Sequence, residues 1–367
     1  MERGRITIKV GASTLTDPGH RIDDAFLERF VADIAAVREA GWKVILVSSG
    51  AIRTGVDSMG LRFDSLSVSE KQAAAAIGQG LLMAKYTEMF APHGIPAAQV
   101  LLTQDIVQFR KKYLNARNTL LKLISMGAIP IVNENDTVAT EEIMFGDNDT
   151  LSAITAVLTD SDLLLLLSDV DGFYMEDPGL AGGGRAVPLI EEITEELRRA
   201  ATGPRAGGGF GGMATKLSAA ETAMNAGIKT VIANGREKNI VRRVAGGERI
   251  GTTFMKRDSH ITGRKKWIAF VPKSEGKIIV NSGAREVIKE KGKSLLPSGI
   301  VGVEGAFERG ACVEIAGEDG RSFARGLTGY SSEEIARIEG KHTREIEKCL
   351  GYSHGDETVH RDNLVIL

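Results

Sequence analysis

Asparagine and aspartate side chains gather at both ends of one segment of the sequence, residues 133–149. An aspartate can receive an ammonium group, and an asparagine can bind either end of a zwitterion, so this composition suits a site for a small polar substrate. A solvated acidic loop is one alternative. Helix capping is another, because a helical apolar run follows and the first N–H groups of a helix lack partners. Two clusters around one segment favour the substrate site; they are Asn133-Glu134-Asn135-Asp136 and Asp147-Asn148-Asp149.

A glycine-rich segment, residues 203–212, precedes an alanine-rich stretch, residues 212–227, that we expect to be helical. A glycine-rich loop leading into a helix lets backbone N–H groups approach phosphate oxygens, and the helix dipole favours the anion. Lys216 lies in the first turn, where the dipole disfavours a positive charge unless an anion is near. The glycines alone fit a flexible surface loop equally well, and the segment is not a Walker loop.

Lys9 lies near the carboxyl end of an apolar segment, residues 6–11, that is expected to be a strand. A lysine is costly to bury there without a partner. On an edge strand it would be an ordinary device against aggregation. The tight turn of small residues that follows, 11–13, favours a lysine that faces a phosphate.

The elements that would position these residues alternate between strand and helix as far as residue 256. We therefore expect residues 1–256 to form a catalytic domain. Continuous apolar runs indicate a mostly parallel central sheet covered by helices on both faces, an α/β fold. Four strands end in small or polar residues, and ligands of such sheets bind outside the carboxyl ends of the strands. We expect strands at 6–11, 42–50, 128–136, 162–172 and 229–235, a helix at 23–41 with Gly41 just past its end, and a helix at 69–90 opened by a capping box of Ser69 and Gln72.

The pattern changes after residue 256. Residues 257–263 are polar and basic and indicate a linker. Short strand-like segments separated by glycines follow, which indicates a small β-rich domain at 264–350. A tail, 351–367, ends in one more strand-like segment.

Composition excludes several classes of protein. The chain has 367 residues, a net charge of −2 and two cysteines without paired spacing. A disulfide scaffold is therefore not expected, and the cysteine content predicts a protein of the reducing cytoplasm. No signal peptide is expected at the start, and the longest apolar stretch is too short to span a membrane. Residues 264–367 hold 17 Lys plus Arg and 16 Asp plus Glu, a net of +1, which does not favour RNA binding.

Four long motifs resemble the glutamate 5-kinases of the amino-acid kinase superfamily, and two C-terminal segments, 264–270 and 294–315, resemble the PUA domain that many bacterial members carry. The motifs are VSSGAIRTG (47–55), NENDTVATEEIMFGDND (133–149), LLLLSDVDGFY (164–174) and GGMATKLSAAETAMNAGI (211–228). The resemblance implies ATP-dependent phosphorylation of the L-glutamate side-chain carboxylate, giving glutamyl 5-phosphate, the first step of proline biosynthesis. It also implies Mg²⁺ bridging the phosphates, inhibition by proline, and a homo-oligomer, a dimer or tetramer.

The resemblance also assigns roles to residues. Lys9 and Lys216 would contact the nucleotide phosphates, with Asp149 organising both lysines, while Asp147 is left to cap the helix. Glutamate would be bound by Ser49, Asp136 and Asn148, and the nucleotide by Ser168, Asp169, Phe210, Gly211, Gly212, Met213, Ala214, Thr215 and Lys216. Many members have a small hydroxyl residue where this chain has Phe210, so at this position a backbone contact is expected.

Physical chemistry agrees with these assignments. A carboxylate with a pKa of about 4.3 is already ionised at neutral pH, so it needs no catalytic base. The transfer needs positioning and positive charge, which two lysines and a glycine-rich loop supply. Kinases for aspartate, acetylglutamate, carbamate and uridylate share the fold, and the segment 133–149 is what favours glutamate.

Overall fold

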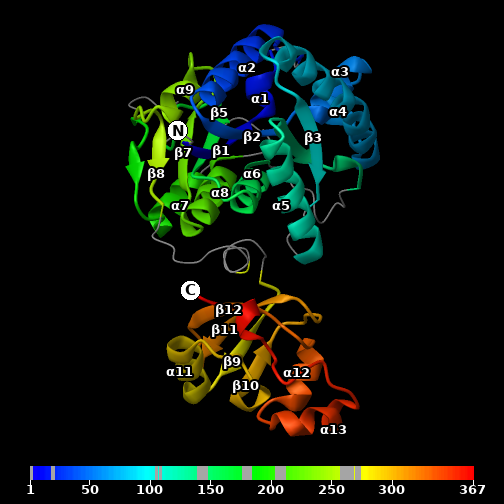
Figure 1. Ribbon diagram of the computed structural model, residues 1–367, viewed down its shortest axis with the longest axis vertical. Coiled ribbons are helices and arrows are strands. Elements are labelled where there is room, and N and C mark those ends of the chain that lie inside the picture. The colour runs from blue at the N-terminus through cyan, green and yellow to red at the C-terminus, as the bar shows by residue number, and fades with distance from the viewer. Residues whose placement is uncertain are drawn as a thin grey trace. The chain divides into compact units, whose positions relative to one another are not determined.

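The chain forms two compact units, Met1–Ser259 and His260–Leu367, in a computed structural model. Figure 1 shows the helices and strands of each unit. The structure describes residues 3–17, 21–103, 106, 110–138, 148–175, 184–202, 212–256, 268 and 274–367.

An eight-stranded sheet runs through the first unit in the order β3-β4-β2-β1-β5-β7-β8-β6. All neighbouring strands are parallel except β7 and β8, which are antiparallel. This confirms the expected mostly parallel sheet. The strands are β1 (Gly4–Val10), β2 (Trp42–Ser48), β3 (Ala97–Leu102), β4 (Ile129–Glu134), β5 (Leu163–Ser168), β6 (Leu189–Ile190), β7 (Lys229–Asn234) and β8 (Thr252–Phe254).

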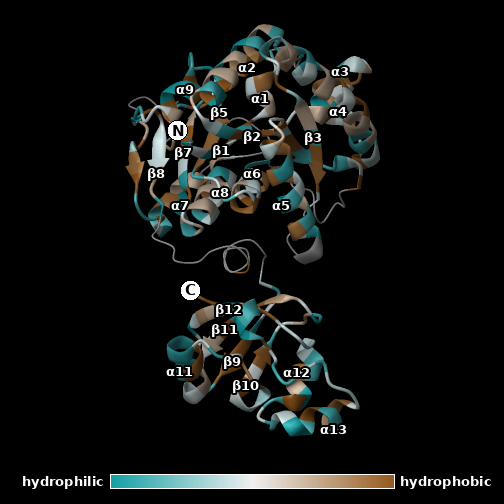
Figure 2. Ribbon diagram, in the orientation of Figure 1, coloured by the Kyte–Doolittle hydropathy of each residue, from teal (hydrophilic) through white to brown (hydrophobic). Residues whose placement is uncertain are grey.

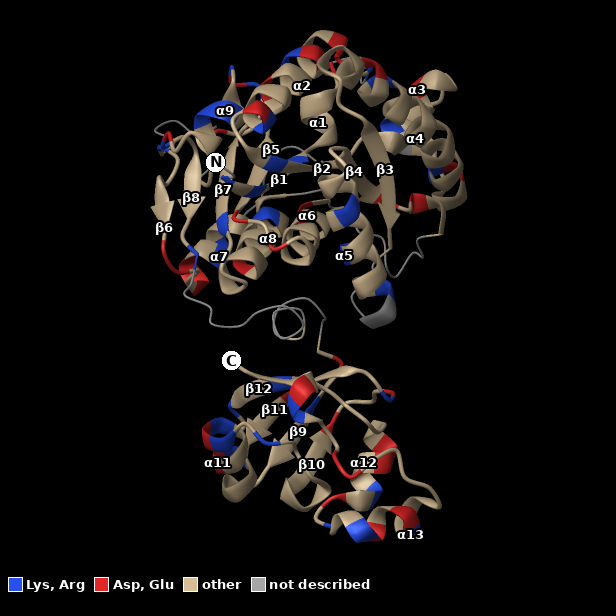
Figure 3. Ribbon diagram, in the orientation of Figure 1, with Lys and Arg blue, Asp and Glu red and all other residues tan. Residues whose placement is uncertain are grey.

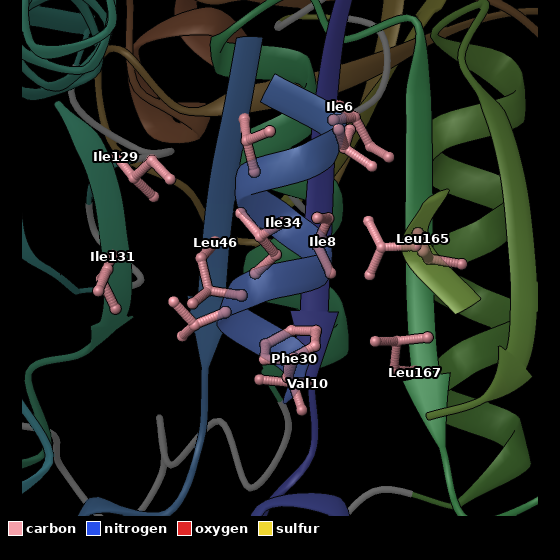
Figure 4. Packing of buried hydrophobic residues seen from close by; sticks show 14 of the residues in the cluster. Ile6, Ile8, Val10, Phe30, Ile34, Leu46, Ile129, Ile131, Leu165 and Leu167 are labelled. Carbon is pink, nitrogen blue, oxygen red and sulfur yellow. The ribbon is translucent and has the colours of Figure 1, made fainter. Parts of the chain in front are cut away.

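Helices cover both faces of this sheet (Figure 1). They are α1 (Ala12–Leu15), α2 (Asp24–Glu39), α3 (Ala51–Ser58), α4 (Val68–Phe90), α5 (Arg110–Ser125), α6 (Asn148–Leu158), α7 (Glu195–Thr202), α8 (Met213–Asn225) and α9 (Ile240–Ala245). The short 3₁₀ turns are η1 (Phe63–Ser65), η2 (Ala91–His93) and η4 (Asp136–Val138). Figure 4 shows Phe30 and Ile34 of α2 packed over strand residues that include Ile8 and Leu46.

The alternation of side chains along β1 decides where Lys9 points. Ile8 and Val10 belong to the hydrophobic core beneath α2 (Figure 4). Because successive residues of a strand face opposite sides, Lys9 faces the other layer of helices, where α6 packs against β1 and α8 against α6. β1 lies in the middle of the sheet, between β2 and β5, so an edge-strand role for Lys9 is excluded.

The structure corrects some local expectations. The N-cap of α4 is Ser67, which forms a capping box with Glu70, so the assignment to Ser69 and Gln72 was wrong. The small-residue turn expected after β1 is the one-turn helix α1. Strands β3, β6 and β8 are additional to those expected from the sequence.

Helices α3 and α4 approach each other with backbone against backbone at two glycines. A Cβ placed on Gly55 would lie 1.9 Å from the Ala74 carbonyl oxygen, and a Cβ on Gly78 would lie 1.9 Å from the Ala51 carbonyl oxygen. Only glycine allows this approach. The contact fixes α4 against the start of α3, which directly follows the carboxyl end of β2.

Gly78→Ala is therefore expected to destabilise the protein by about 1–3 kcal/mol, because the two helices must separate to admit one methyl group. Gly80→Ala is the matched control on the same helix, where nothing lies within 4 Å of an added Cβ. That substitution is expected to stabilise by about 0.4–1 kcal/mol through the unfolded chain. Urea unfolding midpoints measure both, and equal shifts for the two variants would refute the close approach.

The second unit contains a five-stranded sheet in the order β10-β9-β11-β12-β13, which confirms the expected β-rich character. Its strands are β9 (Gly276–Val280), β10 (Ile300–Glu304), β11 (Cys312–Gly317), β12 (Ser322–Leu327) and β13 (Leu364–Ile366). Its helices and turns, none of them predicted, are α11 (Ser282–Lys291), η6 (Pro297–Gly299), α12 (Ser332–Ile338), η7 (Thr343–Glu345), α13 (Ile346–Leu350) and η8 (Arg361–Asn363). In Figure 2, β9 is coloured hydrophobic and α11 is largely hydrophilic, as expected for a core strand and a surface helix.

Within the described residues, no helix is both long and apolar enough to cross a membrane. β13 comes from the segment 351–367, which the sequence indicates as a tail, and it pairs with β12 in the sheet of the second unit.

Candidate active site

Two lysines and one aspartate meet on the helix-covered side of the sheet to which Lys9 points. Lys9 Nζ lies 2.6 Å from Asp149 Oδ1, and Lys216 Nζ lies 3.1 Å from Asp149 Oδ2. The three residues come from β1, α6 and α8, which are labelled in Figure 3. All three are buried, and Asp149 is fully so. Two ammonium groups thus lie on either side of one carboxylate, and ammonium groups are donors that suit an anionic ligand such as a phosphate.

The start of α8 adds a second feature that suits a phosphate. Its N-cap is Gly212, which has no side chain to satisfy the first backbone N–H groups. Thr215 Oγ1 donates to Asp149 Oδ2 at 3.2 Å, which ties this helix start to the charged cluster. Met213 is buried and Ala214 is half-buried. The N-terminus of this helix thus lies beside the two lysines.

A network of amide side chains begins next to Asp149. Asn148 Nδ2 donates to Ser49 Oγ at 2.8 Å, to the Ser48 carbonyl oxygen at 3.0 Å and to Asn133 Oδ1 at 2.8 Å. Ser49 directly follows β2, and its backbone N–H bonds to the Val10 carbonyl oxygen. The structure therefore brings Ser49 and Asn148 together, at the carboxyl ends of β1, β2 and β4.

Asp136 begins the turn η4, which continues from the end of β4. The residue is half-exposed, and the surrounding protein removes part of the water around its carboxyl group. Burial raises the pKa of Asp136 to about 6, because desolvation disfavours the charged form. A carboxylate whose pKa is raised by desolvation is a candidate for a functional role.

The residues expected to line the nucleotide site lie at the end of β5. Ser168 is buried and donates from Oγ to Asp169 Oδ1 at 3.0 Å, whereas Asp169 is exposed. Asn234, at the end of the neighbouring strand β7, donates to Asp171 Oδ1 at 2.9 Å. This pair had not been predicted, although polar residues at strand ends were the signal that could have found it.

Three predicted positions, Asp147, Phe210 and Gly211, lie outside the described residues. Asn133 was predicted only as a member of the polar cluster at 133–136, without a role of its own, and its partner Gln79 of α4 was not predicted. Asn133 had a signal, because it ends a strand, but Gln79 had none, because it lies within a helix.

Among the residues that the structure describes, no three His, Cys, Asp or Glu side chains gather closely enough to hold a metal ion. The carboxylate at the centre of the cluster, Asp149, already contacts both lysines.

Comparisons with known proteins agree with this geometry. The model of the amino acid kinase family matches residues 4–234, and that of the PUA domain matches residues 276–350. The chain therefore belongs to the amino acid kinase family.

Relatives that match almost the whole chain are named glutamate 5-kinase. Those of Pelobacter propionicus and Geobacter sulfurreducens are each 48% identical over 99% of this chain and 97% of their own length. That of Caldanaerobacter subterraneus is 46% identical over 99% of this chain and 98% of its own. Within the amino acid kinase family the chain belongs with the glutamate 5-kinases, and it is a kinase. The resemblance found in the sequence is confirmed.

Proposed function

We propose that this kinase transfers the γ-phosphoryl group of ATP to the side-chain carboxylate of L-glutamate, the reaction that opens proline biosynthesis. The observation that carries the proposal is the buried cluster of Lys9, Asp149 and Lys216 beside the amide network of Asn148. The first supplies positive charge for phosphates, and the second supplies hydrogen bonds for an amino acid. All of these side chains come from the first unit, which we propose carries the catalytic activity.

The proposed transfer requires little covalent chemistry from the protein. The attacking carboxylate is ionised at neutral pH and needs no base. Lys9 and Lys216 stabilise the negative charge that redistributes over the moving phosphoryl group, and Asp149 holds both ammonium groups in place. The backbone of the loop leading into α8 cradles the nucleotide phosphates, together with Ser168 and Asp169 at the end of β5. Mg²⁺ bound with the nucleotide would neutralise part of the phosphate charge.

Recognition of glutamate is assigned to three side chains. Asp136 attracts the α-ammonium group, and Asn148 and Ser49 hydrogen-bond to the amino acid next to the lysines. An acetylated amine carries no positive charge, so acetylglutamate would leave Asp136 without its partner.

An acyl phosphate reacts with hydroxylamine to give a hydroxamate, which can be measured by its colour with iron. Incubation with ATP, Mg²⁺ and one acceptor at a time compares L-glutamate with L-aspartate, N-acetyl-L-glutamate, carbamate and UMP. Hydroxamate with glutamate, and ADP release with no other acceptor, is the expected result. Equal turnover of glutamate and acetylglutamate would contradict the assignment of Asp136.

The raised pKa of Asp136 predicts how glutamate use depends on pH. Below the pKa of about 6 the carboxyl group is neutral and attracts no ammonium group. As pH rises from about 5 to about 7, kcat/KM for glutamate is expected to increase about tenfold, while the ionisation of glutamate itself changes little. Asp136→Asn should give a low kcat/KM with a flat profile over this range. A wild-type profile that is flat would refute the role of Asp136.

We also propose that proline competes with glutamate, because both carry a carboxylate and a cationic α-nitrogen. Proline should raise the apparent KM for glutamate and leave kcat unchanged. An unchanged rate at low glutamate concentration and millimolar proline would show that this enzyme lacks the feedback.

Self-association into a dimer or tetramer is proposed as well. Large apolar side chains are exposed on α4 and just after α3, and such surfaces favour protein contacts; they are Met59, Leu61, Ile77 and Leu81. Light scattering measures the mass in solution, and a monomer at micromolar concentration would contradict the proposal. RNA is not favoured as a partner, because acidic and basic residues are interspersed on the helices of the second unit (Figure 3).

A further inference from the structure

Gln79 of α4 carries a buried hydrogen-bond donor to which the proposed reaction assigns no role. The residue is 8% exposed, and its Oε1 accepts a hydrogen bond from Asn133 Nδ2 at 2.9 Å. Its Nε2 is buried and has no hydrogen-bond partner within the described part of the chain. Leaving an amide N–H group buried without a partner costs free energy, so such a group in a folded protein calls for an explanation.

Two backbone groups fix the orientation of the whole amide network. The Ser48 carbonyl oxygen can only accept, so Asn148 must present its Nδ2 to it. The Glu134 backbone N–H can only donate, so Asn133 must present its Oδ1, at 2.9 Å. These constraints matter because side-chain amides are otherwise ambiguous in orientation.

The orientation of Gln79 then follows. Asn133 uses Oδ1 for the Glu134 N–H group and for Asn148, so its Nδ2 is the atom that faces Gln79. Gln79 must therefore accept this hydrogen bond with its carbonyl oxygen, Oε1. Exchanging the oxygen and nitrogen of the Gln79 amide would place its NH₂ group against the NH₂ group of Asn133, two donors facing each other. The unused Nε2 is thus a consequence of the network and cannot be removed by flipping the side chain.

The position of this donor relates it to the proposed glutamate site. Asn148 neighbours Asp149, which contacts both lysines, and the chain of hydrogen bonds runs from Asn148 through Asn133 to Gln79. Helix α4 also packs against η4, the turn that begins with Asp136. The donor therefore belongs to a helix that packs against the turn of Asp136, and it is joined to Asn148 through one intervening side chain, Asn133.

We propose that Gln79 is a specificity-determining residue whose Nε2 donates a hydrogen bond to the α-carboxylate of the bound acceptor. This inference rests on the proposed function. Of the three charged groups of glutamate, the ammonium group cannot accept a hydrogen bond, and the side-chain carboxylate must lie at the lysines to react. The α-carboxylate is the remaining acceptor, and a neutral donor recognises it without competing with the lysines for the phosphates.

The test compares two acceptors that differ in this group alone. 4-Aminobutyrate keeps the amine and the reacting carboxylate of glutamate and lacks the α-carboxylate. The ratio of kcat/KM for L-glutamate to that for 4-aminobutyrate is measured in the wild type, Gln79→Leu and Gln79→Glu. Where 4-aminobutyrate reacts too slowly to time, its inhibition constant against glutamate supplies the comparison.

Gln79→Leu is expected to lower this ratio about ten- to hundredfold, because a buried donor to a charged group discriminates strongly against a ligand without it. Gln79→Glu keeps the acceptor for Asn133 and replaces the donor by a carboxylate oxygen. It should lower the ratio further, by repelling the α-carboxylate, and leave the KM for ATP unchanged. Glu88→Gln, an exposed substitution on the same helix, should leave the ratio at its wild-type value.

The possible outcomes separate this inference from the proposed function. A structural role for Gln79 would reduce both activities by the same factor and leave the ratio unchanged, which would overturn the inference. A wild-type protein that phosphorylates neither acceptor would overturn the proposed function itself. Thermal unfolding of each variant checks that the fold is kept, and because Gln79→Glu preserves the Asn133 contact, it tests the inference even if Gln79→Leu fails to fold.

Discussion

Replacing Lys216 with alanine is expected to lower kcat by about a hundredfold or more and to change the KM for glutamate far less. The Lys216 ammonium group lies 3.1 Å from Asp149 Oδ2, and it is buried, where water screens its charge little. Its proposed partner is charge that moves with the γ-phosphoryl group, so the contact strengthens in the transition state. A contact of this kind contributes on the order of 3 kcal/mol.

Lys229→Ala provides the control for this variant. Lys229 begins β7, the strand that follows α8, and it lies at the amino end of the sheet, away from the site. Its replacement should leave kcat within about twofold of the wild type. Initial rates over a grid of ATP and glutamate concentrations separate kcat from both KM values. A Lys216→Ala enzyme with normal kcat and a raised glutamate KM would show that the phosphate and substrate ends of the site have been exchanged.

Asp149→Asn should have the largest effect of any single substitution in this chain. Asp149 is fully buried between two ammonium groups, and removing its charge takes away the carboxylate that both lysines contact. Breaking a buried ion pair on one side typically costs about 3–5 kcal/mol of stability. Because both lysines lose their fixed positions, kcat should fall on the order of a thousandfold.

Ligand binding gives this prediction a specific signature. ATP phosphates can replace the missing negative charge, so ATP should raise the thermal unfolding midpoint of Asp149→Asn by more than it raises that of the wild type. The control is Asp24→Asn, which removes an exposed carboxylate from the first turn of α2 and its ion pair with Lys85. That loss should cost less than about 1 kcal/mol. Similar stability losses in the two variants would mean that the Asp149 carboxylate does not stabilise the two buried ammonium groups.

The central strands were predictable because they are covered on both faces and read as continuous apolar runs. The edge strand β3 is only partly buried, and β6 and β8 have two and three residues, so none leaves a comparable pattern. The start of α4 shows a different difficulty. Ser67 with Glu70 and Ser69 with Gln72 both have the spacing of a capping box, and only the folded chain distinguishes them.

The candidate site was predictable to the extent that strand ends gather at one edge of a parallel sheet. That rule by itself places Lys9, Ser49 and Asn133 in the same region, because each lies at or near the carboxyl end of a strand. The free donor of Gln79 could not be predicted in this way. It depends on amide orientations that are set by backbone groups of two other strands, and no spacing within α4 encodes them.

The central place of β1 in the sheet has a consequence for how the protein is made. β1 leaves the ribosome long before one of its two neighbours, β5, which begins only at Leu163. Until then one edge of β1 has no partner in the sheet, and an unpaired apolar strand edge is a site for aggregation. The lysine pair forms later still, once α8 has been synthesised and has packed against α6. The site also joins β1, α6 and α8, which lie far apart in the sequence, so enzymatic activity regained after dilution from denaturant should be among the last signals to recover, well after the helical circular dichroism.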